Sequence, residues 1–280
     1  MENLGYYNGK YGELSEMTIP MSDRVCFFGD GVYDATYSRN YKIFSIDEHI
    51  DRFYNSARLL EIEIAQSKEE LKEILYDMLS KMDTGENFVY FQATRGSGER
   101  NHVFPENGNK ANLWINIFHK EIADVYKKIK LITLDDTRFF HCNIKTLNLI
   151  PSVIASQRAK EAECQEAVLH RNGRVTECAH SNVHILKNGK FITAPTDNLI
   201  LPGIARKHLI KACENLKVVV EERPFFLGEL MDADEIIVSS AGCLCLSASE
   251  IDGREVGSKA PELLKAIQDK VLSEFLEETK

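Results

Sequence analysis

The stretch "HCNIKTLNLIPSVIASQRAKEA" (residues 141–162) places one lysine, Lys145, in an apolar run just before a predicted helix. Burying a charged ammonium without a partner is costly, and burial shifts a lysine toward its neutral, nucleophilic form. Such a lysine either extends its charged end to the surface or takes part in chemistry. Most lysines are solvated, so Lys145 alone does not decide between these alternatives.

The bulk composition limits the possible partners. The chain has 280 residues, 44% of them hydrophobic, and a net charge of −9. This balance excludes the basic footprint of a nucleic-acid or anionic-membrane binder, so a small-molecule partner is expected. The sequence contains neither a signal-peptide pattern nor the roughly 18 apolar residues of a membrane span, and we expect a cytoplasmic protein. Its seven scattered cysteines favour reduced thiols over a disulfide framework or a zinc site.

Turn signals and β-branched runs predict several antiparallel strands. Asparagine or aspartate followed by glycine tolerates the positive φ of a tight hairpin turn. Such pairs occur at Asn8-Gly9, Asn172-Gly173, Asn188-Gly189 and Asp252-Gly253. Runs rich in β-branched and aromatic residues predict strands at 88–94, 113–118, 129–134, 217–222 and 235–240.

Capping patterns predict where the helices begin. Ser45 with Glu48, and Ser67 with Glu70, have the spacing of a capping box ahead of amphipathic segments. The first of these segments is a predicted helix over 47–61. Further helices are predicted at 152–163, 204–215 and 261–277, the last beginning with a proline that suits the first helical position.

A polar segment, 119–128, separates two strand-rich halves. We therefore expect a mixed α and β (α+β) fold in two domains, a smaller one over 1–119 and a larger one over 120–280 that carries Lys145.

Two further features favour a chemical role for Lys145. Glu177 ends a predicted hairpin strand, and the Pro-Gly turn in "NLILPGIARKHLIKAC" leads into a helix whose free N–H groups suit a phosphate. Arg52, on the amphipathic helix, could bind the same phosphate with two hydrogen bonds. Its spacing from Glu48 supports an ordinary i,i+4 ion pair equally well.

The order of the motifs resembles a known family. "FFGDGVYDATYSRNYKIFSIDEHIDRFYNSA", "YFQATRGSGERNHVFPEN", "CNIKTLN", "VTE....SNV" and "ILPGIAR" together resemble the class IV, fold-type IV aminotransferases that use pyridoxal phosphate (PLP). The resemblance covers residues 5 to 255 approximately and is strongest to the D-amino-acid aminotransferases. It implies a two-domain fold, a homodimer, and transfer of an amino group between a D-amino acid such as D-alanine and a 2-oxo acid.

The resemblance also implies roles for the cofactor side of the site. Lys145 matches the family lysine that binds the cofactor covalently and shuttles the α-proton. Glu177 matches the carboxylate that faces the pyridine nitrogen, where a negative charge favours the protonated ring. Arg52 matches the phosphate-binding arginine, and further cofactor contacts are implied for the backbone of Ile204 and Ala205 and for Ser240.

The resemblance implies four residues on the substrate side. Tyr33 and Tyr90 match tyrosines that line it, although strand positions fit core aromatics equally well. Arg100 and His102 match the pair that binds the substrate α-carboxylate from the neighbouring subunit. Fixing the carboxylate on that side decides which face of the α-carbon presents its hydrogen to the lysine, so this pair bears on D versus L selectivity. A solvated basic loop is the alternative for the pair.

Several positions depart from the family pattern. Ala205 and Ala241 stand where hydroxyl residues are common, and Cys178, His180 and His184 replace other residues. Hydrogen bonds to charged groups contribute about 1.5–3 kcal/mol each, so we expect weaker cofactor binding. Three alternatives remain: aminodeoxychorismate lyase activity, an L-selective (branched-chain-like) aminotransferase, and a cofactor-binding homologue with reduced or lost turnover.

Overall fold

The computed structural model describes residues 1–105 and 110–280, which form two compact units. The first unit comprises Met1–Glu121, Ile144–Asn148 and Glu277–Lys280, and the second comprises Ile122–Asn143 and Leu149–Leu276. The segment with Lys145 therefore belongs to the first unit, whereas the sequence placed it in the second domain. The end of one motif quoted above, Glu106 and Asn107, lies outside the described residues.

The first unit is built on an antiparallel six-stranded sheet, in the order β2-β1-β6-β5-β3-β4. Its strands are β1 (Asn3–Tyr7), β2 (Lys10–Gly12), β3 (Gly31–Arg39), β4 (Lys42–Ile43), β5 (Asn87–Thr94) and β6 (Asn112–His119). Its helices are η1 (Leu14–Glu16), α1 (Arg24–Phe28), α2 (Ile46–Leu59) and α3 (Lys68–Leu79). The strands predicted at 88–94 and 113–118 are confirmed.

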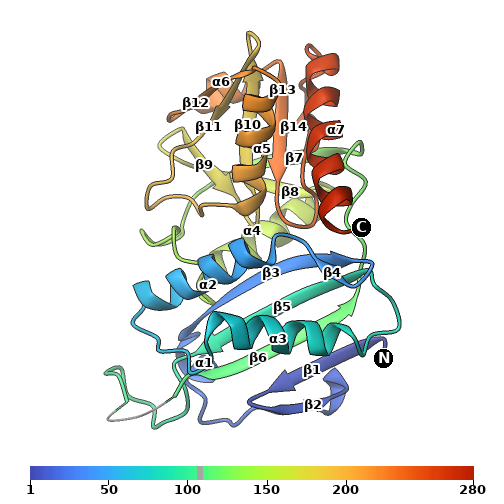
Figure 1. Ribbon diagram of the computed structural model, residues 1–280. Helices are drawn as coiled ribbons and strands as arrows, with labels where there is room; N and C mark the ends of the chain where they lie inside the picture. The colour runs from blue at the N-terminus through green and yellow to red at the C-terminus, as the bar shows by residue number, and fades with distance from the viewer. Residues whose placement is uncertain (106–109) are drawn as a thin grey trace. The chain divides into compact units, whose positions relative to one another are not determined.

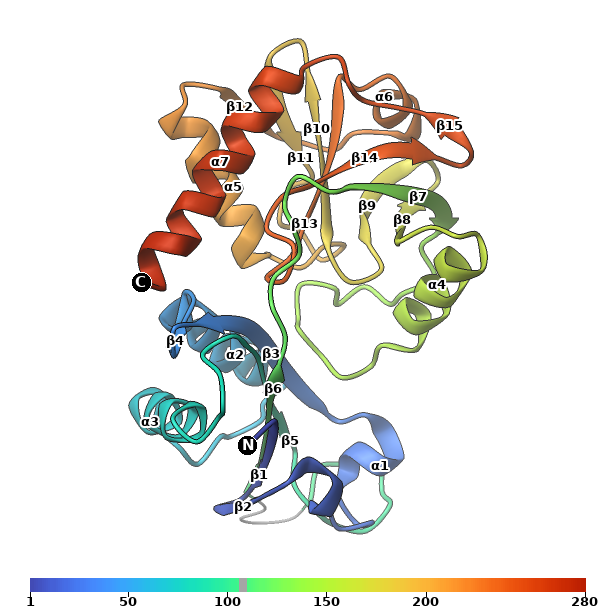
Figure 2. The ribbon, with the colours of Figure 1, turned by 90° about the vertical axis from the view of Figure 1, so that its right-hand side faces the viewer.

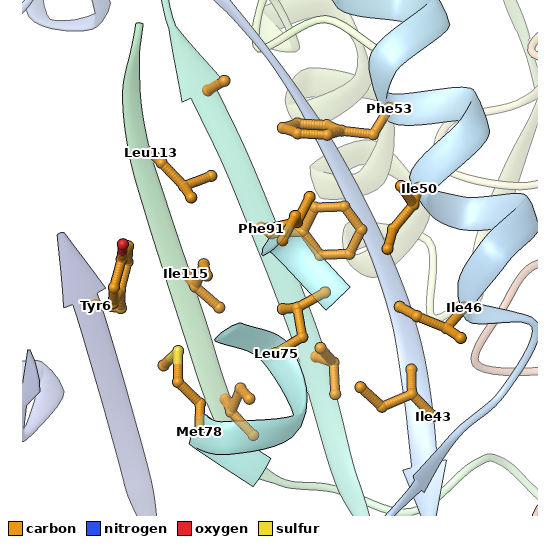
Figure 3. Close-up of a cluster of buried hydrophobic side chains, with 14 of the residues drawn as sticks. Tyr6, Ile43, Ile46, Ile50, Phe53, Leu75, Met78, Phe91, Leu113 and Ile115 are labelled. Atoms are coloured by element: carbon orange, nitrogen blue, oxygen red, sulfur yellow. The ribbon is translucent and has the colours of Figure 1, made fainter. Parts of the chain in front are cut away.

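Helices α2 and α3 cover one face of this sheet (Figure 1). Ile46, Ile50 and Phe53 recur at helical spacing on α2 and point toward the sheet, where the ring of Phe53 lies 5.0 Å from that of Phe91 on β5 (Figure 3). Fully burying an aliphatic or aromatic side chain of this size contributes about 1.5–3 kcal/mol. This core fixes α2, and with it His49 and Arg52, against the sheet.

The two predicted capping boxes have different outcomes. Ser67 and Glu70 form the reciprocal bonds of the box at the start of α3, which confirms the prediction. The prediction for Ser45 is wrong: its φ of 48° is left-handed, and its side chain makes no capping bond. An N-cap needs an extended backbone to reach the first helical N–H groups. The N–H of Ser45 instead donates to the carboxylate of Glu278 at 2.6 Å.

The second unit contains a nine-stranded mixed sheet in the order β12-β11-β10-β13-β14-β7-β8-β9, with β15 paired to β14. Its strands are β7 (Lys128–Asp135), β8 (Glu166–Arg171), β9 (Arg174–Cys178), β10 (Asn182–Lys187), β11 (Lys190–Thr193), β12 (Val219–Glu222), β13 (Glu235–Ser239), β14 (Leu246–Ile251) and β15 (Arg254–Glu255). Its helices are α4 (Ile150–Glu161), α5 (Ile204–Asn215), α6 (Leu227–Met231) and α7 (Pro261–Glu278), of which the last two residues are grouped with the first unit. Helices α5 and α7 run side by side (Figure 2), joined by Lys211 and Glu274 at 2.9 Å.

Most of these elements were predicted from residue patterns in the sequence. All four predicted hairpin turns are present, with asparagine or aspartate φ between 47° and 52° and a positive φ at each following glycine. The strand predicted from residue 217 begins at Val219, because Lys217 has a left-handed φ of 60° where the chain leaves α5. Among the described residues, no helix combines the length and apolarity needed to cross a bilayer.

Candidate active-site residues

The backbone around Lys145 adds to the edge of the first-unit sheet. The N–H of Tyr33 donates to the carbonyl of Lys145 at 2.9 Å, and the N–H of Leu147 donates to the carbonyl of Gly31 at 3.0 Å. On the other side, the N–H of Lys145 donates to the hydroxyl of Ser56 on α2 at 3.2 Å. Ile144 is buried in the core. The main chain of Lys145 is therefore fixed by β3 and α2 together.

The side chain of Lys145 is partly buried and lies against an aromatic face. Its Nζ is 4.3 Å from the centre of the Tyr33 ring, a cation–π distance. No carboxylate within residues 1–105 and 110–280 forms an ion pair with it. An amine that is held in place without an acidic partner is available to react with an electrophile.

Tyr33 and Tyr90 stack on one face of the sheet, with ring centres 5.5 Å apart. Both are partly buried rather than core residues. Burial, with the neighbouring Tyr33, raises the pKa of Tyr90, whose hydroxyl donates to Gln92 at 2.8 Å. Tyr90 therefore remains a protonated hydrogen-bond donor at neutral pH.

Arg52 belongs to a buried cluster that the sequence did not reveal in full. Its guanidinium makes two hydrogen bonds of 2.8 Å to Asp34 on β3, and Nδ1 of His49 lies 2.7 Å from the same carboxylate. Burial raises the pKa of Asp34, but Arg52 and His49 outweigh it and hold the pKa below its ordinary value. Burial lowers the pKa of His49, and the charges of Arg52 and Lys145 act in the same direction. Asp34 is thus ionised and His49 neutral at pH 7.

The i,i+3 spacing of His49 and Arg52 on an amphipathic helix was the available signal for this cluster. Asp34 could not be assigned to it, because the pairing of α2 with β3 is a tertiary contact.

Arg100 and His102 lie on an exposed loop after β5, and both contact Phe28 of α1. The guanidinium carbon of Arg100 is 5.6 Å from the centre of the Phe28 ring, and the His102 ring is 5.2 Å from it. The buried Arg24 donates to the carbonyl of Asn101, between them, at 2.7 Å. The structure therefore holds the two side chains near one aromatic ring.

In the second unit, Glu177 is a buried carboxylate at the end of β9. Nη1 of Arg138 donates to its Oε1, while Oε2 accepts from Nδ2 of Asn182 at 2.9 Å and from the N–H of Leu201 at 3.1 Å. Carboxylates that accept several hydrogen bonds, one from a cation, are held in the charged form. Arg138 and Leu201 were not selected from the sequence, because they lie in other segments of the chain; Asn182 stands in the quoted motif "VTE....SNV" but was given no role.

The Leu201 backbone leads directly to the N-terminus of α5. Gly203 is the N-cap, with no side-chain capping bond, and no described residue accepts from the N–H of Ile204 or Ala205. A Cβ at Gly203 would lie 2.1 Å from Oδ1 of Asn182, so any larger residue would require Asn182 to move. The carboxylate of Glu177 and this helix N-terminus are thus joined through Asn182 and Leu201.

The other second-unit residues singled out from the sequence lie in different environments. Ser240 follows β13, with its hydroxyl 3.2 Å from the sulfur of Cys243. His184 is fully buried between the hydroxyls of Thr193 and Ser239, at 2.8 Å each, and burial lowers its pKa to about 3. His180 is exposed and pairs with the buried Glu166 at 2.5 Å.

The donor sets match the chemistry of pyridoxal phosphate. Among the described residues, the first unit offers an amine without an acidic partner and a partly buried arginine. The second offers a carboxylate that accepts several hydrogen bonds, and a helix N-terminus whose first N–H groups have no acceptor. An aldehyde, a phosphate and a protonated pyridine nitrogen require these groups. The residues present therefore fit this cofactor.

Comparisons with known proteins agree with the sequence interpretation. The family model described as "Amino-transferase class IV" matches residues 31–251. A D-alanine aminotransferase of Bacillus licheniformis is 35% identical over 98% of this chain and 97% of that protein. One of Listeria monocytogenes is 36% identical over 91% of this chain and 90% of that protein.

Two solved structures share the fold. A branched-chain amino acid aminotransferase of Escherichia coli superposes with a TM-score of 0.90 at 22% identity, over 100% of this chain and 97% of that one. A fold IV transaminase of Curtobacterium pusillum has a TM-score of 0.81 at 20% identity, over 94% of this chain and 93% of that one. These likenesses confirm the expected fold class, a mixed α and β fold of type IV.

Proposed function

The chain belongs to the class IV aminotransferases, and from this membership we propose that it transfers an amino group between a D-amino acid such as D-alanine and a 2-oxo acid, with pyridoxal phosphate as its cofactor. One observation carries the catalytic part of the proposal: Lys145 is fixed by backbone bonds to β3 and α2 and has no carboxylate partner among the described residues. The choice of a D-amino acid is supported by the identity to D-alanine aminotransferases.

In this proposal Lys145 attaches the cofactor and later accepts the substrate α-proton at Nζ. The bound cofactor supplies an electron sink for the negative charge that remains on the α-carbon. Glu177 holds a proton at the pyridine nitrogen, because its own carboxylate stays ionised between Arg138 and Asn182. The N–H groups of Ile204 and Ala205, with Arg52, bind the phosphate.

The substrate α-carboxylate is assigned to Arg100 and His102, which would act from the partner subunit of a homodimer. Orientation of the carboxylate sets which face of the α-carbon presents its hydrogen to Nζ. The homodimer is supported by an apolar face of α4, where Ile150, Val153 and Ile154 have relative exposures of 70%, 60% and 52%. Contiguous exposed apolar residues of this kind mark interaction surfaces. The cytoplasmic location expected from the sequence is part of the same proposal.

The first experiment is an absorption spectrum of the purified protein with PLP, before and after adding D-alanine or L-alanine. The proposal expects a visible band of the bound cofactor that D-alanine bleaches and L-alanine does not. Faster bleaching by L-alanine would contradict the assigned selectivity and favour an L-selective aminotransferase. A band that neither enantiomer changes would favour a lyase or a homologue without turnover.

A lysine variant tests the mechanism itself. Lys145→Ala should abolish transamination, and borohydride treatment of the wild-type protein should attach the cofactor to the peptide that contains Lys145. Lys270→Ala, at an exposed position of α7, is the control and should leave both results unchanged. Undiminished transamination by Lys145→Ala would refute the mechanism.

A further inference from the structure

The carboxylate of Glu177 does not stand alone but ends a row of alternating charges. Arg171 donates from Nε to Oδ2 of Asp136 at 3.2 Å, and Arg138 lies between Asp136 and Glu177. All four groups are partly or fully buried, with relative side-chain exposures of 16%, 0%, 12% and 7% in the order Arg171, Asp136, Arg138, Glu177. Buried charges that alternate in sign stabilise one another, because each is screened little by water.

Asp136 fixes the plane of the Arg138 guanidinium. Nε and Nη2 of Arg138 donate to the two oxygens of Asp136 at 3.0 and 2.9 Å, and the Arg138 backbone N–H adds a third bond at 3.0 Å. This two-point contact leaves Nη1 directed at Oε1 of Glu177. A planar fork of this kind has a fixed direction, which a lysine ammonium cannot reproduce.

Asp136 also limits how strongly Arg138 acts on Glu177. Burial raises the pKa of Asp136, but Arg138 and Arg171 bring it below its ordinary value, so Asp136 is ionised at neutral pH. Burial lowers the pKa of Arg138, and its two carboxylate partners more than reverse this. The charge of Arg138 is therefore shared, and Glu177 keeps negative charge for a further cationic partner.

We infer that Arg138 is a positioning residue for Glu177: held in plane by Asp136, it sets the orientation and the charge of the carboxylate that faces the cofactor ring. This inference rests on the proposed function, because the further cationic partner is the protonated pyridine nitrogen of PLP. Asn182 and Leu201 donate to Oε2, whereas Arg138 donates to Oε1, so the two oxygens of the carboxylate are held by different residues.

The test is a double-mutant cycle on PLP binding, measured as the dissociation constant of PLP from the full-length apoprotein. If Arg138 acts through Glu177, Arg138→Met should weaken PLP binding roughly tenfold or more. The same substitution should cost less than about threefold in a Glu177→Gln background, where there is no carboxylate charge to orient. Equal losses in both backgrounds would overturn the inference.

The pH dependence gives a second readout that a purely structural role would not change. In Arg138→Met, the Glu177 carboxyl remains buried without its cation, so its pKa rises and it binds a proton at higher pH. The ratio of variant to wild-type dissociation constants should therefore increase as the pH falls from 8 to 6. A ratio that does not change with pH would overturn the inference.

Two further variants separate folding effects from positioning. Arg138→Lys keeps the charge but not the planar fork. It should bind PLP more tightly than Arg138→Met, and the ratio of its dissociation constant to that of the wild type should change little between pH 8 and 6, even if Arg138→Met folds poorly. An affinity of Arg138→Lys no better than that of Arg138→Met, with both proteins folded, would count against the inference. Arg174→Met removes an arginine of the same strand as Glu177 that pairs with Asp197, and should change PLP affinity by less than about twofold.

Failure of the proposed function gives a different result. A wild-type protein that does not bind PLP would refute the proposed function and this inference with it. If the wild-type protein binds PLP but Arg138→Met weakens binding equally with and without Glu177→Gln, only the role of Arg138 is overturned.

Discussion

Asp34 is the residue whose neutralisation should destabilise the first unit most clearly. It is fully buried and is the shared acceptor of two bonds from Arg52 and one contact from His49. Removing one partner of a buried ion pair leaves the other charge without compensation, at a cost of about 3–5 kcal/mol. Asp34→Asn keeps the shape and one acceptor oxygen, so we expect the lower end of this range, about 3 kcal/mol.

Thermal unfolding of the apoprotein measures this cost. A loss of 1 kcal/mol lowers Tm by about 2–4 °C for a chain of roughly this size, so Asp34→Asn should lower Tm by about 6–12 °C at pH 7. Asp51→Asn is the control, on the helix that carries His49 and Arg52: Asp51 binds Lys68 of α3 at 2.6 Å, but its side chain is 65% exposed. Exposed ion pairs contribute about 0–1 kcal/mol, so its Tm should change little.

The pH dependence of the Tm difference between wild type and Asp34→Asn follows from the lowered pKa of Asp34. A carboxylate with a depressed folded pKa contributes stability that is present above its unfolded pKa of about 3.9 and lost as pH falls toward the folded value. The Tm gap between wild type and Asp34→Asn should therefore be constant from pH 8 to 5 and narrow only below about pH 4. A gap no larger than that of Asp51→Asn at pH 7 would refute the reasoning.

Three smaller predictions concern caps and a buried histidine. Ser67→Ala should cost about 1 kcal/mol in urea unfolding through loss of the capping box. Ser45→Ala should cost less, since Ser45 makes no side-chain cap and the bond from its hydroxyl to Glu278 is long, at 3.3 Å. Glu278→Gln should lower Tm, because a charged acceptor for the Ser45 N–H is replaced by a neutral one. His184→Gln should flatten the fall in stability between pH 6.5 and 3, where only the unfolded wild-type His184 binds a proton.

Features determined by adjacent residues were predictable from the sequence. The four hairpin turns depend on residues that accept a positive φ, and the cap at Ser67 depends on a residue three positions later. The cap at Ser45 failed because this residue has a left-handed φ of 48°, and its N–H donates to Glu278, 233 positions away. A pattern read over one helical turn cannot include such a contact.

The same limit applies to the candidate site. Lys145 and Glu177 stand in local motifs, but the groups that hold them do not: Arg138 and Leu201 bind Glu177 from other segments of the chain. The polar segment at 119–128 suggests a boundary that leaves Lys145 in the larger domain, whereas hydrogen bonds to β3 group Ile144–Asn148 with the first unit.

The charges around Lys145 explain why a lysine is retained in that apolar run. Asp34 compensates Arg52, and burial keeps His49 neutral at pH 7. Among the described residues, the cluster therefore holds two cationic side chains, Arg52 and Lys145, and one carboxylate, that of Asp34. A buried or partly buried cation of this kind favours an anion as its ligand, since binding removes the uncompensated charge. A phosphate-bearing aldehyde provides both an anionic group for this cation and an electrophile for the amine, whereas a neutral aldehyde provides the electrophile alone.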